Sequence, residues 1–478
     1  MSWTHDLIVI GAGAAGLTAA GGAARLGLRV ALIERHRLGG ECLHTGCVPS
    51  KALIAAARRA HQLRGGPGAA SMGSTASGVR TDYAGVRAHV QAAIAAIAPH
   101  DSEARLRAWG VEVIRGDARF LGPAAITVAG CRLAAPRIVL ATGSRPAVPP
   151  IEGLDSTPYL TNETLFDLAE LPRHLLVLGG GAIGTETAQA FRRLGAAVTL
   201  VEPGRVLSRH DPEAAAIALD HLAAEGVEIH AATRAVRVDP TPDGIRLALS
   251  TGVTLTGSHL LVAAGRRAAL DGLDLAAAGI EASEAGVRVD ACRRTTNHHV
   301  LAIGDCRDGP RFTHAAGYEG ALAVKRIALG LPARAAYAAL PFVTYTDPEL
   351  AQLGETEQAA RARHSVVRVD RVEFSDNDRA VTEGATAGFL KLIRARGRLV
   401  GVTAVGAGAG ELLLPWSLVL SGKASTWSLS AAVVPYPSRS EISREAAFAA
   451  HEALIFGRLA RGWAHGLAAL RSLRPDRH

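Results

Sequence analysis

Two cysteines, Cys42 and Cys47, stand five positions apart in the stretch GGECLHTGCVPSK. A zinc site usually pairs cysteines two to four residues apart and needs further cysteine or histidine ligands, and no such cluster follows in the sequence. We therefore predict no metal site and interpret the pair as a disulfide. Five residues of regular helix rise about 7.5 Å, which exceeds the usual Cα separation across a disulfide. The segment is therefore expected to bend, with Gly46 providing the freedom.

The second cysteine precedes a predicted helix. Pro49 is tolerated in the first turn of a helix, where its missing N–H would be unpaired anyway, and helix-forming residues continue to Leu63. We expect Cys47 to lie just outside the helix N-terminus. That position lowers the pKa of a thiol, so it favours a thiolate.

A second chemical signal is a pattern that the chain contains twice. Residues 6–34 (DLIVIGAGAAGLTAAGGAARLGLRVALIE) align without a gap with residues 174–202 (HLLVLGGGAIGTETAQAFRRLGAAVTLVE). Each copy has an apolar strand, a G-x-G-x-x-G turn, a helix-period stretch, a second strand and a final glutamate, which predicts two dinucleotide-binding units. The glycines are Gly11, Gly13 and Gly16 in the first copy and Gly179, Gly181 and Gly184 in the second.

Each copy has the chemistry that a nucleotide pyrophosphate requires. The first glycine permits the tight turn, the second lets the backbone approach the pyrophosphate, and the third lets the helix pack on the strand. The helix N-terminus then offers unpaired N–H groups to the anion. The final carboxylates, Glu34 and Glu202, can accept hydrogen bonds from ribose hydroxyls. The Glu202 carboxylate would repel a 2′-phosphate, which favours NADH over NADPH at the second site. The nearby Arg205 could accommodate a phosphate, so NADPH stays open.

The composition excludes several classes of protein. The chain of 478 residues is too long for one core of usual size, and 48% hydrophobic with 20% charged residues is ordinary for an α/β protein. The net charge of +8 comes from basic residues scattered along the chain, so we expect no nucleic-acid partner. The first residues do not form a signal peptide and no apolar run is long enough to span a bilayer, which predicts a cytoplasmic protein.

Together these features resemble the pyridine nucleotide-disulfide oxidoreductase family of FAD flavoproteins, which includes dihydrolipoamide dehydrogenase, glutathione reductase and mercuric reductase. The resemblance covers essentially the whole chain. It implies that the first glycine motif, with Glu34, binds the ADP part of FAD and that the second, with Glu202, binds the nicotinamide dinucleotide. Three more family motifs match: an A-T-G turn, an A-x-G-R turn, and the Gly-Asp pair of the FAD ribityl site. Their residues are Ala141, Thr142 and Gly143; Ala264, Gly265 and Arg266; and Gly304 and Asp305.

The resemblance also assigns roles around the cysteines. It implies that Cys47 faces the flavin as the charge-transfer thiolate and that Cys42 attacks the substrate, with Lys51 and Glu186 as an ion pair beside the flavin. A hydride would pass from the nicotinamide to the flavin, and two electrons would then reach the disulfide and finally an acceptor. The implied acceptors are a small disulfide, a lipoyl group, or a soft metal or other electrophile.

The architecture implied by the resemblance is α/β, with two Rossmann-like domains of the glutathione reductase type and a C-terminal α+β dimerisation domain. We expect an FAD-binding domain over residues 1–145 and 267–338, an NAD(P)-binding domain over 146–266, and a dimerisation domain over 339–478. The last domain would form a homodimer and send its C-terminal residues into the partner's active site.

One motif departs from the family pattern. Disulfide-reducing members carry His-Pro-Thr-x-x-Glu near the C-terminus, where the histidine carries protons. This chain has PYPSRSE, so Tyr436 takes the histidine position and Glu441 the glutamate position. A phenol has an ordinary pKa near 10 and is a poor base at neutral pH, so dithiol–disulfide exchange should be slow. Two alternatives stay open: Tyr436 only fills space at a dimer interface, or His44 serves as the base instead.

Mercuric reductases share a tyrosine in a similar run, but they also carry a C-terminal cysteine pair, and this chain has no cysteine after Cys306. The best match is therefore a mercuric reductase-like or dihydrolipoamide dehydrogenase-like member without an assigned acceptor. Two alternatives stay open. One is a flavin enzyme that reduces a quinone or oxygen without the thiols, and the other is a redox-sensing protein that has lost turnover.

The C-terminal tail is a second departure. Apolar residues recur there at helical spacing, with arginines among them, which predicts a basic amphipathic helix. Such a helix could lie on an anionic membrane, or pack against its own protein or its dimer mate. The apolar residues are Ile455, Leu459, Trp463, Leu467 and Leu470, and the arginines are Arg458, Arg461, Arg471 and Arg474.

Overall fold

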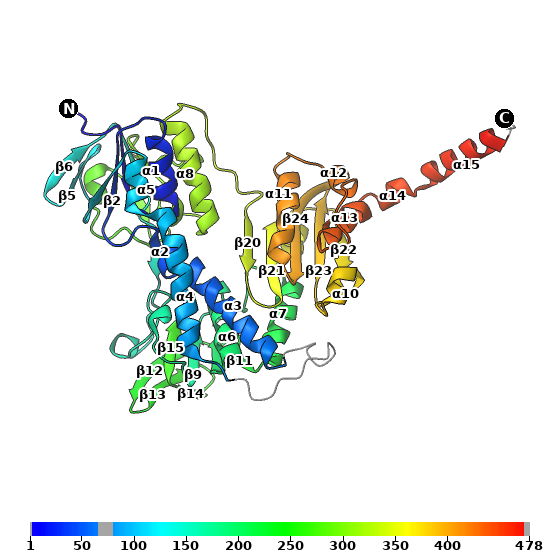
Figure 1. The fold of residues 1–478 in the computed structure, drawn as a ribbon, viewed down its shortest axis with the longest axis horizontal. Coiled ribbons are helices and arrows are strands. Elements are labelled where there is room, and N and C mark those ends of the chain that lie inside the picture. Colours follow the sequence, from blue (N-terminus) through cyan, green and yellow to red (C-terminus); the bar gives the residue numbers. More distant parts are fainter. Residues whose placement is uncertain (1, 66–79, 473–478) are drawn as a thin grey trace. The chain divides into compact units, whose positions relative to one another are not determined.

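The computed structural model describes residues 2–65 and 80–472, which form two compact units (Figure 1). Unit 1 lies within residues 1–207 and 223–336, and unit 2 lies within residues 208–222 and 337–478. The three-domain division predicted from the sequence, with boundaries after residues 145, 266 and 338, stays a proposal.

The first sheet of unit 1 is parallel and five-stranded, in the order β19-β7-β1-β2-β3. Its strands are β1 (Leu7–Ile10), β2 (Val30–Glu34), β3 (Val111–Arg115), β7 (Arg137–Leu140) and β19 (Val300–Ala302). Successive side chains of a strand point to opposite faces, and both faces of β1 are buried. Leu7 and Val9 pack on the side of helix α1 (Ala14–Ala24), whereas Ile8 and Ile10 pack on the side of a small antiparallel sheet.

Two further elements cover this sheet. The antiparallel sheet consists of β4 (Arg119–Gly122), β5 (Ala125–Val128) and β6 (Cys131–Ala134). Helix α8 (Thr313–Ile327) crosses α1 at close range, because a Cβ on Gly320 would lie only 2.7 Å from the Ala15 carbonyl oxygen. The close crossing packs the middle of α8 against the helix of the first glycine unit.

The second glycine unit builds its own parallel sheet, in the order β11-β10-β9-β15. The strands are β9 (His174–Leu178), β10 (Ala197–Val201), β11 (Val227–His230) and β15 (His259–Val262), and helix α6 (Ala182–Leu194) joins β9 to β10. An antiparallel sheet of β12 (Ala235–Thr241), β13 (Gly244–Leu249) and β14 (Thr254–Gly257) shares its core. Both repeats therefore fold as strand, helix and strand, and the predicted α/β class is confirmed.

The described residues between the first repeat and β3 are mostly helical. It contains α2 (Gly40–His44), α3 (Cys47–Leu63), α4 (Tyr83–Ile97), the 3-10 helix η1 (Ala98–Asp101) and α5 (Glu103–Ala108). Further along, the two-stranded pair β8 (Ser144–Pro146) and β16 (Arg266–Ala268) brings two of the predicted motifs side by side.

Unit 2 is an antiparallel five-stranded sheet with helices, as expected for an α+β domain. The order is β20-β21-β24-β23-β22, and the strands are β20 (Pro341–Thr344), β21 (Glu349–Gly354), β22 (Val367–Glu373), β23 (Phe389–Ala395) and β24 (Arg398–Gly406). Alternate residues such as Leu390 and Leu392 face a core shared with α11 (Leu413–Leu420) and α13 (Ser440–Ala449).

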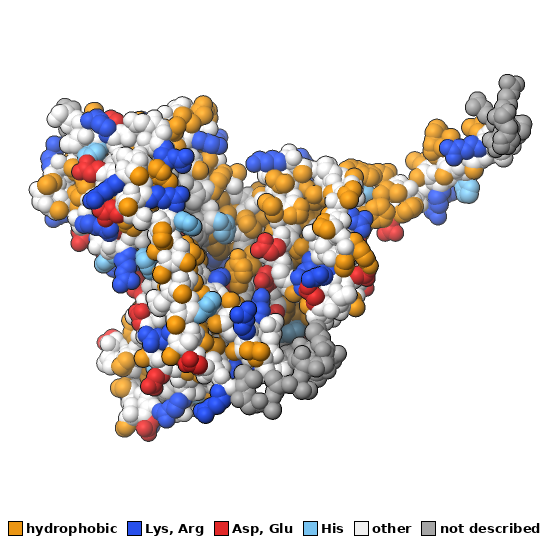
Figure 2. Space-filling model, viewed as in Figure 1, with side chains coloured by type: hydrophobic (Ala, Val, Ile, Leu, Met, Phe, Trp, Pro, Cys, Tyr) orange, Lys and Arg blue, Asp and Glu red, His pale blue; other side chains and the backbone are white. Residues whose placement is uncertain are grey.

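The chain continues beyond α13 into α14 (Glu452–Ile455) and α15 (Arg458–Ser472). Hydrophobic side chains are visible along this C-terminal segment, with basic ones among them (Figure 2). Arg474, the last arginine of the predicted tail helix, lies outside the described residues. Within residues 2–65 and 80–472, every helix is too short or too polar to cross a membrane.

Candidate active site

The two cysteines lie at the junction of two helices in unit 1. Cys42 belongs to α2, and Cys47 is the first residue of α3, so this helix begins one residue earlier than predicted. Gly46 separates the helices, and a Cβ there would lie 3.0 Å from the Glu41 carbonyl oxygen. The expected bend is therefore present. Both cysteines are partly buried free thiols in this structure.

The two thiols differ in proton affinity. Their mutual hydrogen bond is the largest cause that lowers the pKa of Cys47, to about 6, and the Thr313 hydroxyl and the Lys51 ammonium act in the same direction. Thr313 Oγ1 lies 3.1 Å from Cys47 Sγ. The same bond between the thiols, followed by burial, raises the pKa of Cys42. The contacts therefore lower the pKa of Cys47 and raise that of Cys42.

The Lys51 side chain joins this site to the second glycine unit. Its Nζ lies 2.8 Å from Oε2 of Glu186, a buried residue of α6. Lys51 follows Cys47 by one helical turn of α3, so the two side chains share a face. The structure thus brings together four of the predicted catalytic residues, Cys42, Cys47, Lys51 and Glu186, although their roles stay proposals.

The first and third glycines of each motif stand where a side chain would not fit. Gly11 and Gly179 have φ of 102° and 111°, and a Cβ on either would lie 2.4 Å from a carbonyl oxygen at the end of a neighbouring strand. A Cβ on Gly16 or Gly184 would lie 1.8 Å from the carbonyl oxygen of the first glycine of its own motif. The helix of each unit therefore packs directly against its turn.

The second glycines face open space. A Cβ on Gly13 or Gly181 would meet nothing within 4 Å, and each of these glycines is the uncapped N-cap of its helix. The first N–H groups of α1 and α6 thus point toward a space that a phosphate can enter.

The two carboxylates at the strand ends have matching environments. Glu34 accepts the N–H groups of Ala12 at 2.8 Å and His36 at 2.7 Å. Glu202 accepts the N–H groups of Gly180 at 2.7 Å and Gly204 at 2.9 Å. These bonds fix each carboxylate beside its glycine turn, and each oxygen keeps a lone pair for a ribose hydroxyl.

The remaining FAD motifs surround the carboxyl edge of the first sheet. Ala141 and Thr142 follow β7, and two glycines in this region have positive φ: 74° at Gly143 and 71° at Gly304. Gly265, with φ of 138°, follows β15 of the second sheet. Asp305 accepts the Ser144 hydroxyl at 2.8 Å. Open glycine turn, uncapped helix and oriented carboxylates are the donor and acceptor set that FAD requires, so the residues present fit this cofactor.

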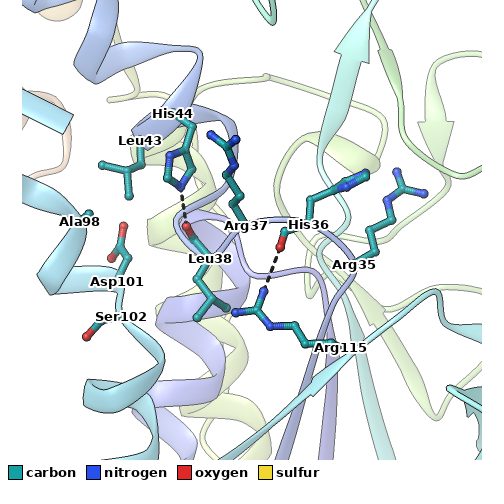
Figure 3. Close-up of a pocket in the computed structure, with 10 residues that line it drawn as sticks. All are labelled: Arg35, His36, Arg37, Leu38, Leu43, His44, Ala98, Asp101, Ser102 and Arg115. Carbon is teal, nitrogen blue, oxygen red and sulfur yellow. Dashed lines mark hydrogen bonds between the residues drawn. The ribbon is translucent and has the colours of Figure 1, made fainter. Parts of the chain in front are cut away.

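A pocket of about 520 Å³ opens where the loop after β2 meets α2 and η1 (Figure 3). Its lining residues are Arg35, His36, Arg37, Leu38, Leu43, His44, Ala98, Asp101, Ser102 and Arg115. His44 was the alternative candidate for a base near the thiols. Its Nε2 lies 2.8 Å from the Leu38 carbonyl oxygen, so this nitrogen donates a proton there and the ring lines the pocket. The structure therefore gives His44 a structural contact in place of a contact with the thiols.

Tyr436 and Glu441 lie in unit 2, whereas the other predicted site residues lie in unit 1. The Tyr436 hydroxyl donates to Asp378 Oδ2 at 2.6 Å, and this bond raises the pKa of Tyr436 above its ordinary value. Glu441 stands in the first turn of α13, where its carboxylate accepts the Ser438 N–H at 3.4 Å. A phenol with a raised pKa is ionised even less at neutral pH than the sequence alone suggests, so it is even less available as a base.

Several contacts of the site were not anticipated. Thr313 touches Cys47, and Glu41 pairs with Arg266 next to Cys42. Glu319 is fully buried and accepts the Gly304 N–H at 2.7 Å. A carboxylate directly before the small residues Gly320 and Ala321 in the middle of α8 was the available signal for Glu319. Among the described residues, no group of three or more His, Cys, Asp or Glu side chains could hold a metal ion.

Comparisons with known proteins agree with this geometry. The family profile described as pyridine nucleotide-disulphide oxidoreductase matches residues 5–320, and the profile of its dimerisation domain matches residues 340–447. A dihydrolipoyl dehydrogenase of Thermus scotoductus is 36% identical and covers 95% of this chain and 98% of its own. A mercuric reductase of Streptomyces lividans is 34% identical, and the match covers 93% of this chain and 95% of that protein.

A solved structure shares the fold as well. The Cu(II) complex of the HOCl-induced flavoprotein disulfide reductase RclA from Escherichia coli superposes with a TM-score of 0.82 at 27% identity, covering 92% of this chain and 98% of that one. The dimerisation-domain match supports a homodimer. The profile matches and the two relatives show that the chain belongs to the pyridine nucleotide-disulphide oxidoreductase family, whose members use FAD and NAD(P)H.

Proposed function

We propose that this oxidoreductase passes electrons from NADH by way of FAD to the Cys42–Cys47 pair, and from the resulting dithiol to a small acceptor. FAD, when bound, supplies the two-electron transfer between nicotinamide and sulfur. The observation that carries the proposal is the asymmetry of the thiols, since one hydrogen bond lowers the pKa of Cys47 and raises that of Cys42. Such a pair holds a stable thiolate at one sulfur and a thiol at the other, which becomes the nucleophile when it loses its proton.

The proposed roles follow from the contacts. Thr313 and Lys51 stabilise the Cys47 thiolate, and Glu186 orients Lys51. Cys42 gives its proton to solvent, and its thiolate attacks the acceptor. With a disulfide acceptor, a bond forms between Cys42 Sγ and one acceptor sulfur, the acceptor's S–S bond breaks, and the other half leaves as a thiolate. Cys47 then attacks Cys42 Sγ, which restores the Cys42–Cys47 disulfide, breaks the bond to the acceptor and releases its second half as a thiolate. A divalent soft metal ion such as Hg(II) would instead be bound by the two thiolates and leave with their two electrons as the disulfide forms.

The cofactor sites are assigned on the same basis. The first glycine turn with Glu34 would hold the ADP part of FAD, and Asp305 would bind the ribityl chain. The second turn with Glu202 would hold the nicotinamide dinucleotide, and its carboxylate favours NADH over NADPH. Contributing residues are Gly11, Gly13, Gly16, Ala141, Thr142, Gly143 and Gly304 for FAD and Gly179, Gly181, Gly184 and Gly265 for the second site.

An anaerobic titration with NADH tests the proposal. Reduction of the purified flavoprotein should produce a long-wavelength thiolate-to-flavin absorption band, and free-thiol counts should rise by two for each subunit. A protein that bleaches without the band and without new thiols would disprove the dithiol route. That result would favour direct electron transfer to a quinone or oxygen, and failure of NADH to reduce the flavin at all would favour a redox sensor without turnover.

The residue at the proton-carrier position, Tyr436, narrows the class of acceptor that we propose. Tyr436 is held by Asp378 with a raised pKa, so it is a poor base for dithiol–disulfide exchange. Cys42 must lose its proton whichever acceptor it attacks, but a soft metal ion releases no acceptor thiolate that has to be protonated. We therefore propose soft metal ions or other electrophiles ahead of small disulfides and lipoyl groups. Tyr436→His should accelerate reduction of a lipoamide-type disulfide much more than reduction of Cu(II) or Hg(II). Equal effects on both classes would contradict this order.

We also propose that the C-terminal helix contacts an anionic membrane surface of the cytoplasm. No residue of α15 is buried, and its apolar and basic side chains share one amphipathic helix without an acidic residue. Leu459 is 91% exposed and Trp463 is 72% exposed, so nothing in unit 2 covers this face within the described residues. Binding to vesicles with anionic lipids should weaken with salt and disappear on truncation after Phe456. Binding that survives truncation would disprove the helix's role.

A further inference from the structure

The residue just before the first cysteine has an unexpected partner. Glu41 and Cys42 are neighbours in α2, and Arg266 is the first residue of β16. Arg266 Nη1 donates to Glu41 Oε1 at 2.7 Å, and Nη2 contacts the second carboxylate oxygen. The Glu41 side chain is only 29% exposed, and the Arg266 side chain is only 17% exposed. The geometry is a bidentate ion pair away from most of the solvent, which is the most directional arrangement that these two groups can adopt.

The pair connects the cysteine loop with the proposed ribityl site. Arg266 Nε donates to the Ser144 hydroxyl at 2.8 Å, and Ser144 in turn donates to Asp305 at 2.8 Å. On the other side, Asn162 donates to the Glu41 carboxylate and, at 3.1 Å, to the carbonyl oxygen of Thr45 between the two cysteines. Glu41 thus lies at the centre of a network that holds both ends of the loop.

The pair adjoins Cys42 in the chain, and the Cys42 thiol is hydrogen-bonded to Cys47, the cysteine with the lowered pKa. The Cys47 thiolate is stabilised by nearby cations and destabilised by nearby anions. With both partners in place the pair contributes little net charge, whereas removal of either partner leaves an uncompensated charge in a poorly hydrated place.

We infer that Glu41 is a positioning residue of the redox site: its ion pair with Arg266 fixes the cysteine loop and sets the equilibrium between disulfide and dithiol. The inference rests on the proposed cycling of Cys42 and Cys47. It gives Glu41 no contact with the reacting atoms. It adds a residue to the site that neither glycine turn nor cysteine spacing indicates.

The test compares two charge-removing variants. Purified FAD-containing protein is equilibrated at pH 8 with glutathione buffers, and alkylation with mass spectrometry gives the disulfide fraction. E41Q leaves Arg266 unpaired and should shift the equilibrium about threefold to tenfold toward the dithiol, because a nearby cation favours the thiolate. R266Q leaves the carboxylate unpaired and should shift it in the opposite direction. A tenfold shift corresponds to about 30 mV for a two-electron couple.

Two controls separate tuning from folding. E41D keeps the charge and should restore the equilibrium most of the way to wild type, which also tests the inference if E41Q does not accumulate. D370N removes a comparable pair, Asp370 with Arg394, whose side chains are 18% and 15% exposed in unit 2. This variant should lower the melting temperature and leave the thiol equilibrium unchanged.

The outcomes distinguish the inference from the function it rests on. Shifts of opposite sign for E41Q and R266Q support the inference. A wild-type disulfide that forms normally, with both variants unmoved or moved in the same direction, would overturn the inference alone. A wild-type protein that forms no disulfide in any buffer would overturn the proposed function together with it.

Discussion

The two glycine-turn units share a backbone and differ in what one helix position does. In each unit a carboxylate, Glu34 or Glu202, stands at the end of the second strand. It accepts one N–H group from the glycine turn and one from the residue two positions after itself. At equivalent helix positions, Thr18 donates its hydroxyl to its own helix, whereas Glu186 reaches Lys51. The positions that the two units share are those expected of a nucleotide site. The position that differs, Glu186, connects the second unit to the helix that carries Cys47.

The largest expected effect comes from the unrepeated segment. Cys42→Ser should slow turnover of a dithiol-dependent acceptor on the order of a thousandfold or more, because serine cannot form the disulfide. Reduction of bound FAD by NADH in a single turnover should persist, since both glycine turns are intact. Stopped-flow absorbance and steady-state assays measure the two steps separately. Cys131→Ser, at an exposed thiol, is the control and should change neither.

The outcome decides whether the two regions are functionally distinct. If Cys42→Ser keeps full steady-state turnover, electrons leave the flavin without the cysteines, and the segment between the repeats has no redox role.

A smaller effect should separate the two turns from each other. Gly179→Ala introduces a Cβ 2.4 Å from a carbonyl oxygen at a φ of 111°. Strain of about 1–3 kcal/mol at this turn should raise KM for NADH about tenfold to a hundredfold, while the protein keeps its FAD. Gly11→Ala has the same clash in the first turn and should instead be isolated with little FAD. The ratio of flavin to protein absorbance and the KM for NADH are the measurements.

Each variant serves as the control for the other. If Gly179→Ala also loses FAD, the assignment of one cofactor to each turn is wrong.

The difference between the regions also explains what the sequence could predict. Glycines and carboxylates that recur at fixed spacing follow from local backbone geometry, so both strand-helix-strand units and the α/β fold were predictable. Contacts between residues far apart in the sequence were not predictable. Thr313 meets Cys47 across 266 positions, and Arg266 meets Glu41 across 225. Neither residue type is diagnostic by itself. Such contacts depend on how the sheet order brings distant loops to one edge, which local periodicity does not contain.

The choice between NADH and NADPH should depend on one carboxylate. Glu202→Ala removes the acceptor for ribose hydroxyls, so kcat/KM for NADH should fall about tenfold. The value for NADPH should stay constant or rise, because the carboxylate no longer opposes a 2′-phosphate. Glu34→Ala is the matched change in the first unit, and it should lower FAD content without altering this preference. Equal losses with both nucleotides would show that Glu202 supports the turn and does not select the ligand.

The smallest effect concerns the protonation of Cys47. Its pKa is lowered to about 6, chiefly by the hydrogen bond with Cys42 and further by Thr313 and Lys51. A group with a depressed pKa keeps its charge above that value, so the thiolate-to-flavin band of the reduced protein should persist at neutral pH and fade as pH falls through about 6. Thr313→Val removes one hydrogen bond to the thiolate, 3.1 Å long, and should raise the midpoint by up to about one unit.

Thr313→Ser keeps the hydroxyl and should leave the midpoint near that of the wild type. This pair of variants tests whether the distant contact tunes the thiolate or merely packs against it. If valine and serine give the same midpoint, the hydroxyl contributes nothing to the charge, and the low pKa of Cys47 must come from Cys42 and Lys51 alone. In that case all the groups that tune the thiolate would lie in α2 and α3, the short segment that the two repeats do not share.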